Sequence, residues 1–443
     1  MFRRDTLVMK RLLPFLLGVL YLSFSTAHVS ADDYGYPIES GPAATVIGTP
    51  EELRADLPER IDTQRLRLDS AGGVEVPEVF WYEDKMRYSA AFQDHPAPLI
   101  FTIAGTGASY HDGNSIMMQK AFYQAGFHVI SLSSPTYMNF IITASSTGVP
   151  GHTELDARDL YRVMQKAWEE ARKDGVEATK FFVTGYSLGG MNAAFVAKLD
   201  EERTMFNFQR VLMINPPWSL YNSVSLLDRM VDDIPGGLDK VNVFFDQLIY
   251  RFAAVYKQRE AEKGNTEVDF TSSDFLHAVY EAYKPTDEKV DALIGVFFRI
   301  LYANMAFSSD VVSKSGFVVP RNVVLTSTTD LGTYSAVVHR ETDFIKYFDG
   351  LFIPYFEQKY PDLTRDELIR QLSLEPIEEY LASSEKIGVV TNANDIILKP
   401  EDLANLERVF GDRIKVYPRG GHLGNMEYKE NVAYMVDFFK DQE

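Results

Sequence analysis

The sequence predicts an α/β protein with a mainly parallel central sheet, helices on both faces of that sheet, and a large helical insertion. Strand-like apolar runs alternate with helical segments through residues 64–217, and the alternation returns at residues 386–443. This alternation favours a parallel sheet, because parallel neighbours need a crossover connection that is usually a helix. Between the two stretches, apolar residues recur at helical spacing, which predicts a mostly helical lid inserted after the sixth strand, at residues 218–385.

The first part of the core begins at one edge of the predicted sheet. Residues 63–68 and 79–82 are short alternating runs, which predict an antiparallel pair at that edge. Further along, continuous apolar runs predict buried strands, and amphipathic runs predict helices. The strands are expected at residues 98–104, 126–132, 180–184 and 210–217, and the helices at residues 114–125, 155–173 and 191–198.

The remaining segments are predicted in the same way. In the second part of the core, strands are expected at residues 386–391 and 413–417, and helices at residues 400–409 and 431–440. Within the insertion, Thr364 and Glu367 have the spacing of a capping box, and residues 322–327 form the one strand-like interruption. Residues 32–63 are polar and rich in proline, which predicts an irregular N-terminal extension lying on the main domain.

A short motif carries the strongest functional signal. Gly185-Tyr186-Ser187-Leu188-Gly189 matches G-x-S-x-G, the strand-to-helix turn that holds a nucleophilic serine in a strained conformation. Gly185 and Gly189 suit so sharp a turn, because a β-carbon there would bring strand and helix into collision. The motif alone is common, but here a strand-like run precedes it and a helical run follows it. The alternative is an ordinary glycine-rich connection.

A serine nucleophile needs a base and a group that orients the base. Asp395 lies just beyond one predicted strand, and His422 lies in a glycine-rich turn just beyond the next. Residues beyond the carboxyl ends of parallel strands share one crevice, so Ser187, Asp395 and His422 are predicted to meet as a catalytic triad. Asp330 is the alternative acid, although it precedes the last two strands by a wide margin.

With serine, acid and histidine in this order, residues 64–217 and 386–443 resemble the α/β-hydrolase-fold superfamily. The chain also resembles a group of exported bacterial proteins of that fold. The resemblance implies an oxyanion hole made of two backbone N–H groups. Leu188, directly after the nucleophile, would supply the first. Thr106 would supply the second, with Gly107 as the alternative, because the fold's common His-Gly is replaced here by Ala104-Gly105.

The N-terminus has the pattern of a signal peptide. Residues 1–31 combine four basic residues, an uncharged apolar run at 12–22 and small residues at a cleavage site. We therefore expect export to the periplasm or the medium; the alternative is a short membrane anchor. No integral membrane span is expected after cleavage.

Charge and cysteine content narrow the class of protein. Removing four basic residues and Asp5 with the signal peptide takes the net charge from −19 to about −22. A surface so acidic repels nucleic acid, which is not an expected partner. The chain has no cysteine, which excludes disulfides and thiolate catalysis.

The leading hypothesis is a carboxylesterase-like or lipase-like serine hydrolase. It would cleave an ester or thioester of a hydrophobic acid through an acyl-enzyme on Ser187. The alternatives are a serine peptidase or amidase with the same triad, and a non-catalytic protein that binds a ligand or partner on a hydrolase scaffold. No cofactor or metal is expected: the dinucleotide-like Gly105-x-Gly107 lacks its third glycine, and no His-Glu-x-x-His is present. The sequence does not indicate an oligomeric state.

Overall fold

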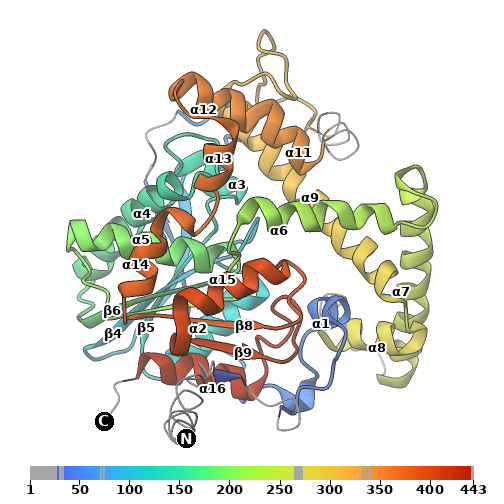
Figure 1. The fold of residues 1–443 in the computed structure, drawn as a ribbon, viewed down its shortest axis with the longest axis horizontal. Helices are drawn as coiled ribbons and strands as arrows, with labels where there is room; N and C mark the ends of the chain where they lie inside the picture. The colour runs from blue at the N-terminus through green and yellow to red at the C-terminus, as the bar shows by residue number, and fades with distance from the viewer. Residues whose placement is uncertain are drawn as a thin grey trace, which may run out of the picture.

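A computed structural model describes residues 27–28, 34–69, 72, 75–263, 273–331, 334, 338 and 342–440. Its centre is a nine-stranded sheet in the order β1-β9-β8-β7-β6-β4-β5-β3-β2 (Figure 1). The strands are β1 (Ala27–His28), β2 (Gln64–Leu68), β3 (Met86–Ala91), β4 (Ala97–Ile103), β5 (His128–Leu132), β6 (Ala178–Tyr186), β7 (Arg210–Ile214), β8 (Ile387–Asn392) and β9 (Ile414–Tyr417). All pairings are parallel except β2 with β3 and β3 with β5. The predicted mainly parallel sheet is confirmed.

Helices cover both faces of the sheet, as predicted. One apolar core contains side chains of α2 (Gly113–Gln124) and α16 (Lys429–Phe439). A larger core on the other face contains side chains of α4 (Thr153–Lys173), α5 (Leu188–Arg203) and α15 (Pro400–Phe410), and continues into the insertion. The strands between the two cores are buried on both sides, which explains why their sequences are continuous apolar runs.

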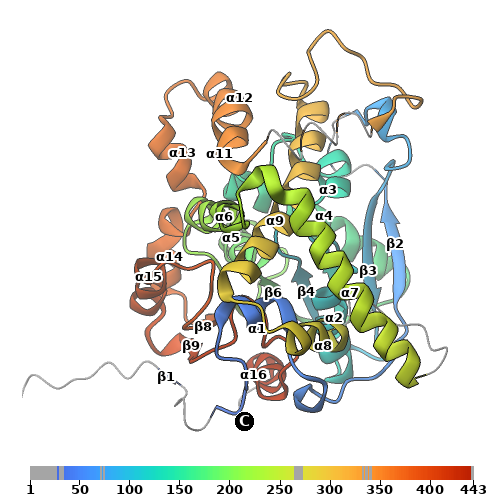
Figure 2. The same ribbon diagram turned by 90° about the vertical axis from the view of Figure 1, so that its right-hand side faces the viewer.

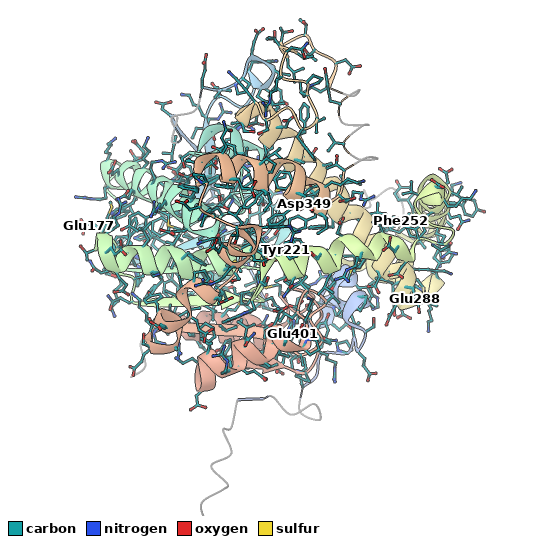
Figure 3. The ribbon with its side chains drawn as sticks, turned by 45° about the horizontal axis from the view of Figure 1, so that its top comes forward. Glu177, Tyr221, Phe252, Glu288, Asp349 and Glu401 are labelled. Carbon is teal, nitrogen blue, oxygen red and sulfur yellow. The ribbon has the colours of Figure 1, made fainter. Side chains whose placement is uncertain are left out.

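The segment between β7 and β8 is mostly helical, which confirms the predicted insertion after the sixth core strand. Its longer helices, α7 and α9, stand to one side of the sheet (Figures 1 and 2). Arg365 links two other parts of the insertion, because its guanidinium contacts Asp349 at 3.0 Å and the Tyr221 hydroxyl at 3.2 Å. Asp349 and Tyr221 are labelled in Figure 3. The helices are α6 (Leu220–Arg229), α7 (Val241–Lys263), α8 (Ser273–Tyr283), α9 (Asp287–Ser313), α11 (Phe344–Tyr347), α12 (Ile353–Lys359), α13 (Arg365–Gln371) and α14 (Glu378–Ser383).

Helix α9 is long and apolar enough to cross a membrane by length and composition. Of its most apolar window, 56% is buried inside the protein. It packs on α3 (Met138–Thr143), α6 and α1 (Gly41–Ile47). A core helix of a large insertion has the same properties, so this helix does not by itself indicate a membrane span.

Two short strands predicted from the sequence are absent from the structure, and a predicted capping box is present. Residues 79–82 are not a strand: Glu78–Phe80 is a 3-10 helix after Pro77, and the second edge strand is β3. Residues 322–327 form no strand either, because Val323 turns back to the Pro320 carbonyl and Val324 is 83% exposed. The capping box of Thr364 with Glu367 is present.

The N-terminal part of the chain is more ordered than predicted. The extension contains α1, and its Tyr34 stacks on Tyr417 with ring centroids 4.8 Å apart. Of the predicted signal peptide, only Ala27–His28 is described, as strand β1 beside β9; the rest lies outside the described residues. The division of the chain into domains at residues 63, 217 and 385 remains a prediction.

Candidate active site

Ser187 sits at the sharp turn between β6 and α5. Its backbone has φ 55° and ψ −127°, a conformation that a residue with a side chain adopts only when its surroundings enforce it. The turn is anchored to β7 by the Ser187 N–H, which donates to the Ile214 carbonyl at 2.8 Å. A β-carbon on Gly185 would overlap the Gly189 carbonyl, and one on Gly189 would overlap the Ile103 carbonyl. Both positions therefore need glycine, because β6, α5 and β4 lie too close together there for a β-carbon.

Three side chains from three sheet-end loops form a hydrogen-bonded chain. His422 Nε2 lies 3.0 Å from Ser187 Oγ. On the other side of the ring, His422 Nδ1 lies 3.0 and 3.1 Å from the two carboxylate oxygens of Asp395. The Asp395 carboxylate is buried, whereas His422 is partly accessible. The alternative acid, Asp330, is exposed on the insertion, and Asp395 occupies the position beside the histidine.

Two further groups hold the acid. Asn215 Nδ2 donates to Asp395 Oδ2 at 2.8 Å, and the Ile397 N–H donates to Oδ1 at 3.1 Å. The Asp395 oxygens thus have partners besides the histidine. Asn215 follows β7 and has φ 45°, a left-handed conformation that asparagine adopts more readily than most residues. An asparagine directly before Pro216 was the only sequence signal for this role.

The N-terminal extension holds the histidine. The His422 backbone N–H donates to Thr45 Oγ1 at 2.8 Å, and the Thr45 hydroxyl donates to the Gly41 carbonyl at 2.8 Å. The turn that carries His422 packs directly on α1. Glycines at 421 and 424 allow this packing, because a β-carbon at either position would overlap a backbone carbonyl of α1. No sequence pattern around Thr45 marks it as part of the site.

In the part of the chain that the structure describes, two backbone N–H groups without an acceptor lie in the turns next to Ser187. The parallel register pairs Ile103 with Gly185, so the turn after β4 lies against the nucleophile turn. The Gly107 N–H donates to Thr136 Oγ1 at 2.7 Å and is therefore engaged. Among the described residues, the N–H groups of Thr106 and Leu188 have no acceptor. Leu188 is also the first residue of α5, where a helix presents unpaired N–H groups and partial positive charge. The engaged amide of Gly107 favours Thr106 over Gly107 as the second donor, and the oxyanion hole itself stays a prediction.

The site opens into a largely apolar cavity of about 590 Å³. Ser187, His422 and Thr106 lie in its wall, together with Phe297 and Leu301 of α9. A smaller apolar pocket, about 30 Å³, lies on the side of Thr106 and Leu188 and shares Leu301. Helices of the insertion thus form much of the wall around the serine.

Polar groups near the serine are also held in fixed partnerships. The Tyr186 hydroxyl donates to Asp112 Oδ2 at 2.5 Å, and burial raises the pKa of Tyr186 well above its ordinary value. Tyr186 is thus a neutral hydrogen-bond donor at neutral pH.

Within the described parts of the chain, no three His, Asp or Glu side chains are grouped to hold a metal ion.

No protein-family model and no curated protein sequence matches the chain. Among solved structures, a hyperthermophilic esterase from Pyrobaculum calidifontis is similar at 15% identity over 89% of this chain and 87% of that one, with a TM-score of 0.40. The thioesterase domain from the curacin biosynthetic pathway is similar at 11% identity over 85% and 98%, with a TM-score of 0.36. The carboxylesterase EstE1, cloned from a metagenomic library, is similar at 12% identity over 90% and 94%, with a TM-score of 0.40.

Proposed function

The chain has the α/β-hydrolase fold, and from this premise we propose that it is a serine hydrolase of carboxylic esters of hydrophobic acids. One observation carries the proposal: the hydrogen-bonded chain Asp395–His422–Ser187 stands at a strained turn and opens into an apolar cavity. A serine hydroxyl is a weak nucleophile, and this arrangement is the one that activates it.

In the proposed first step, Ser187 Oγ attacks the ester carbonyl while His422 Nε2 takes the hydroxyl proton. Asp395 fixes the ring with Nδ1 protonated, so that Nε2 is free to accept, and it stabilises the imidazolium that forms. Asn215 keeps the carboxylate of Asp395 in place. The carbonyl oxygen becomes an oxyanion, and the N–H groups of Thr106 and Leu188 are the donors that would bind it.

Acylation is completed when His422 passes the proton to the leaving alkoxide and the alcohol departs. The acyl group then remains on Ser187. Water enters, loses a proton to His422, and attacks the acyl carbonyl, which releases the acid and restores the serine. A thioester would follow the same course with a thiol as the leaving group.

The cavity supports a hydrophobic substrate. Seven of the side chains in its wall are Phe or Leu of the insertion, so an acyl chain bound there would be removed from water and would contact mainly apolar groups. Transfer of each methylene from water is worth about 0.8 kcal/mol, so chain length should strongly affect kcat/KM until the chain outgrows the cavity.

Hydrolysis of p-nitrophenyl esters from acetate to palmitate tests the proposal. We expect turnover by the protein lacking residues 1–31, with a maximum at a medium or long chain. Ser187→Ala should lose it. Absence of turnover across the series would refute the ester specificity, and turnover of p-nitroanilides alone would favour the amidase alternative. Export remains a prediction, and cell fractionation tests it.

A further inference from the structure

A second pocket adjoins the cavity at Ser187. It has a volume of about 100 Å³ and lies between α7, α8 and α9 of the insertion. Four residues line both spaces: Val46, Phe252, Leu276 and Leu293. The two spaces are therefore adjacent, and a ligand that extends from the serine along the insertion would reach the side chains that border the second pocket. We call this second space the distal pocket.

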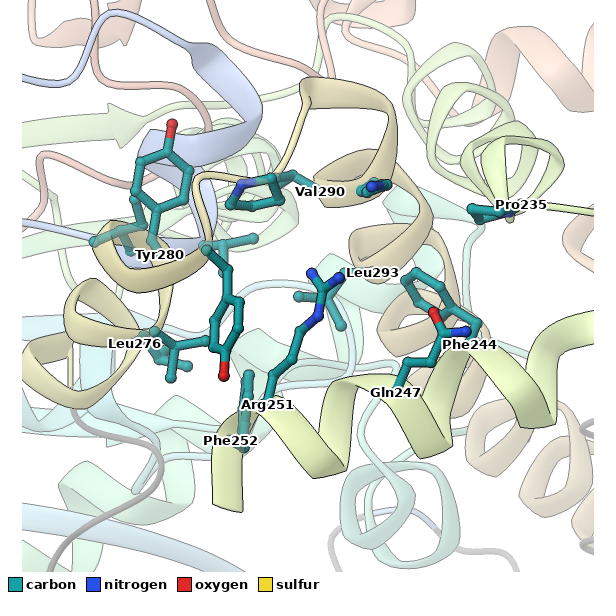
Figure 4. A pocket seen from close by; sticks show the side chains of 15 residues that line it. Pro235, Phe244, Gln247, Arg251, Phe252, Leu276, Tyr280, Val290 and Leu293 are labelled. Carbon is teal, nitrogen blue, oxygen red and sulfur yellow. The ribbon is translucent and has the colours of Figure 1, made fainter. Parts of the chain in front are cut away.

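The distal pocket contains one arginine among mostly apolar side chains. Arg251 extends from α7 toward the middle of the pocket, with Phe252 and Leu293 nearby (Figure 4). The Arg251 guanidinium carbon lies 5.0 Å from the centre of the Tyr283 ring. Gln247, one turn earlier on α7, also faces the pocket and adds an amide donor (Figure 4). Lys289 lies on the wall formed by the start of α9.

Arg251 has no anionic partner among the described residues: none of their carboxylates lies within 4.0 Å of its guanidinium, and none of their oxygens accepts a hydrogen bond from it. Other arginines of the insertion differ: Arg299 lies 3.7 Å from Asp228, and Arg370 lies 3.1 Å from Glu375. The contrast is notable in a chain with 63 acidic and 44 basic residues.

A partly buried cation among apolar side chains loses part of its hydration, and the counter-charge of a ligand would offset that loss. Guanidinium is also the side chain best shaped for a carboxylate, because two parallel N–H donors match its two oxygens. The cation–π contact with the Tyr283 ring gives the guanidinium a neighbour that does not neutralise its charge.

We propose that the distal pocket binds a carboxylate that the substrate carries at the far end of a hydrophobic chain. This inference rests on the proposed function. The substrate class it names is a half-ester of a long dicarboxylic acid, or an equivalent ester with one anionic terminus. The ester lies at Ser187, the chain crosses the walls shared by the two spaces, and the free carboxylate pairs with Arg251. The uncharged analogue makes every contact except that pair.

Matched substrates test the proposal. Mono-p-nitrophenyl esters of suberic, sebacic and dodecanedioic acids carry a free carboxylate, and their methyl-capped counterparts carry none. We expect kcat/KM at pH 8 to favour the free acid by about tenfold or more at the best chain length. Arg251→Gln should bring that ratio close to one, and Arg251→Lys should leave an intermediate ratio, because the charge stays and the planar donor pair is lost. Lys257→Gln removes an exposed charge from the same helix and should keep the wild-type ratio.

A binding experiment separates this inference from the proposed function. Monomethyl and dimethyl sebacate are titrated calorimetrically into the full Ser187→Ala chain, which needs no turnover. Tighter binding of the monomethyl ester that is lost in Ser187→Ala with Arg251→Gln would support the carboxylate site even if ester hydrolysis failed. Equal binding of the two esters, or a preference that survives Arg251→Gln, would overturn it. Thermal unfolding of Arg251→Gln and Arg251→Lys confirms that the variants are folded.

Discussion

Thr45→Val is the substitution that best tests how the N-terminal extension supports the site. Valine keeps the branched shape of threonine but removes the hydroxyl that accepts the His422 N–H at 2.8 Å. The backbone at His422 would then have a partly buried donor without an acceptor. The expected consequence is a shift of the turn that carries the ring, and with it of Nε2 relative to Ser187 Oγ.

The size of the effect follows from the cost of that unpaired donor. Leaving a buried donor unsatisfied costs about 1 to 3 kcal/mol. If the whole cost is expressed in the transition state, kcat/KM falls by about 5- to 150-fold. If the turn relaxes in the ground state as well, part of the cost appears as lower thermal stability instead, so this range is an upper bound on the kinetic loss.

The assay is steady-state hydrolysis of a medium-chain p-nitrophenyl ester, with thermal unfolding measured on the same samples. Thr45→Ser restores a hydroxyl and should recover most of the activity. Thr49→Val is the matched control, because Thr49 bonds the same turn through the Gly424 carbonyl at 2.9 Å without contacting His422. It should lower stability with a smaller effect on kcat. Equal kcat/KM in Thr45→Val and wild type would show that the Thr45 hydroxyl does not position His422.

Three other perturbations test separate parts of the account. Gly189→Ala should lower Tm by more than about 5 °C and abolish hydrolysis, whereas Gly113→Ala, whose added β-carbon meets nothing within 4 Å, should keep both. Leu301→Trp narrows both spaces beside the serine, so the chain-length optimum should move to shorter esters; an unchanged optimum would place the acyl chain elsewhere. Burial, and after it the negative charge of Asp233, raises the pKa of Asp291 to about 6. Between about pH 4 and pH 6 the folded state therefore holds a proton that the unfolded state has lost, so stability falls as the pH rises through this range. Asp291→Asn should thus gain about 1 kcal/mol, allowing for solvent screening, at pH 7.5 and nothing at pH 4 in thermal or urea unfolding.

The sequence predicts the parts of the site that depend on local chain geometry. The turn at Ser187 is a contiguous motif, and its strand and helix can be identified from the residues on either side. The positions of Asp395 and His422 follow from a simple rule about the carboxyl ends of parallel strands. Short-range patterns and one topological rule are sufficient for these three residues.

Supporting residues could not be found in the same way, because their contacts are distant in sequence. Thr45 meets His422 across 377 residues, and Asn215 meets Asp395 across 180. Nothing in the neighbourhood of Thr45 indicates that partner. The choice between Thr106 and Gly107 likewise depended on Thr136, which engages the Gly107 amide. The strand predicted at residues 79–82 is absent for another reason. Pro77 starts a helical turn that buries the adjacent Val79 and Phe80 together, whereas the alternation of a strand would put them on opposite faces.

Labelling with a fluorophosphonate tests whether Ser187 is the nucleophile, because the probe reacts only with an activated serine. We expect one phosphonate adduct per chain, found by peptide mass spectrometry on Ser187. The adduct should be absent from Ser187→Ala and formed at a much lower rate in His422→Ala. A wild-type protein that takes up no label, or carries it on a different serine, would contradict the assignment of Ser187 as the nucleophile.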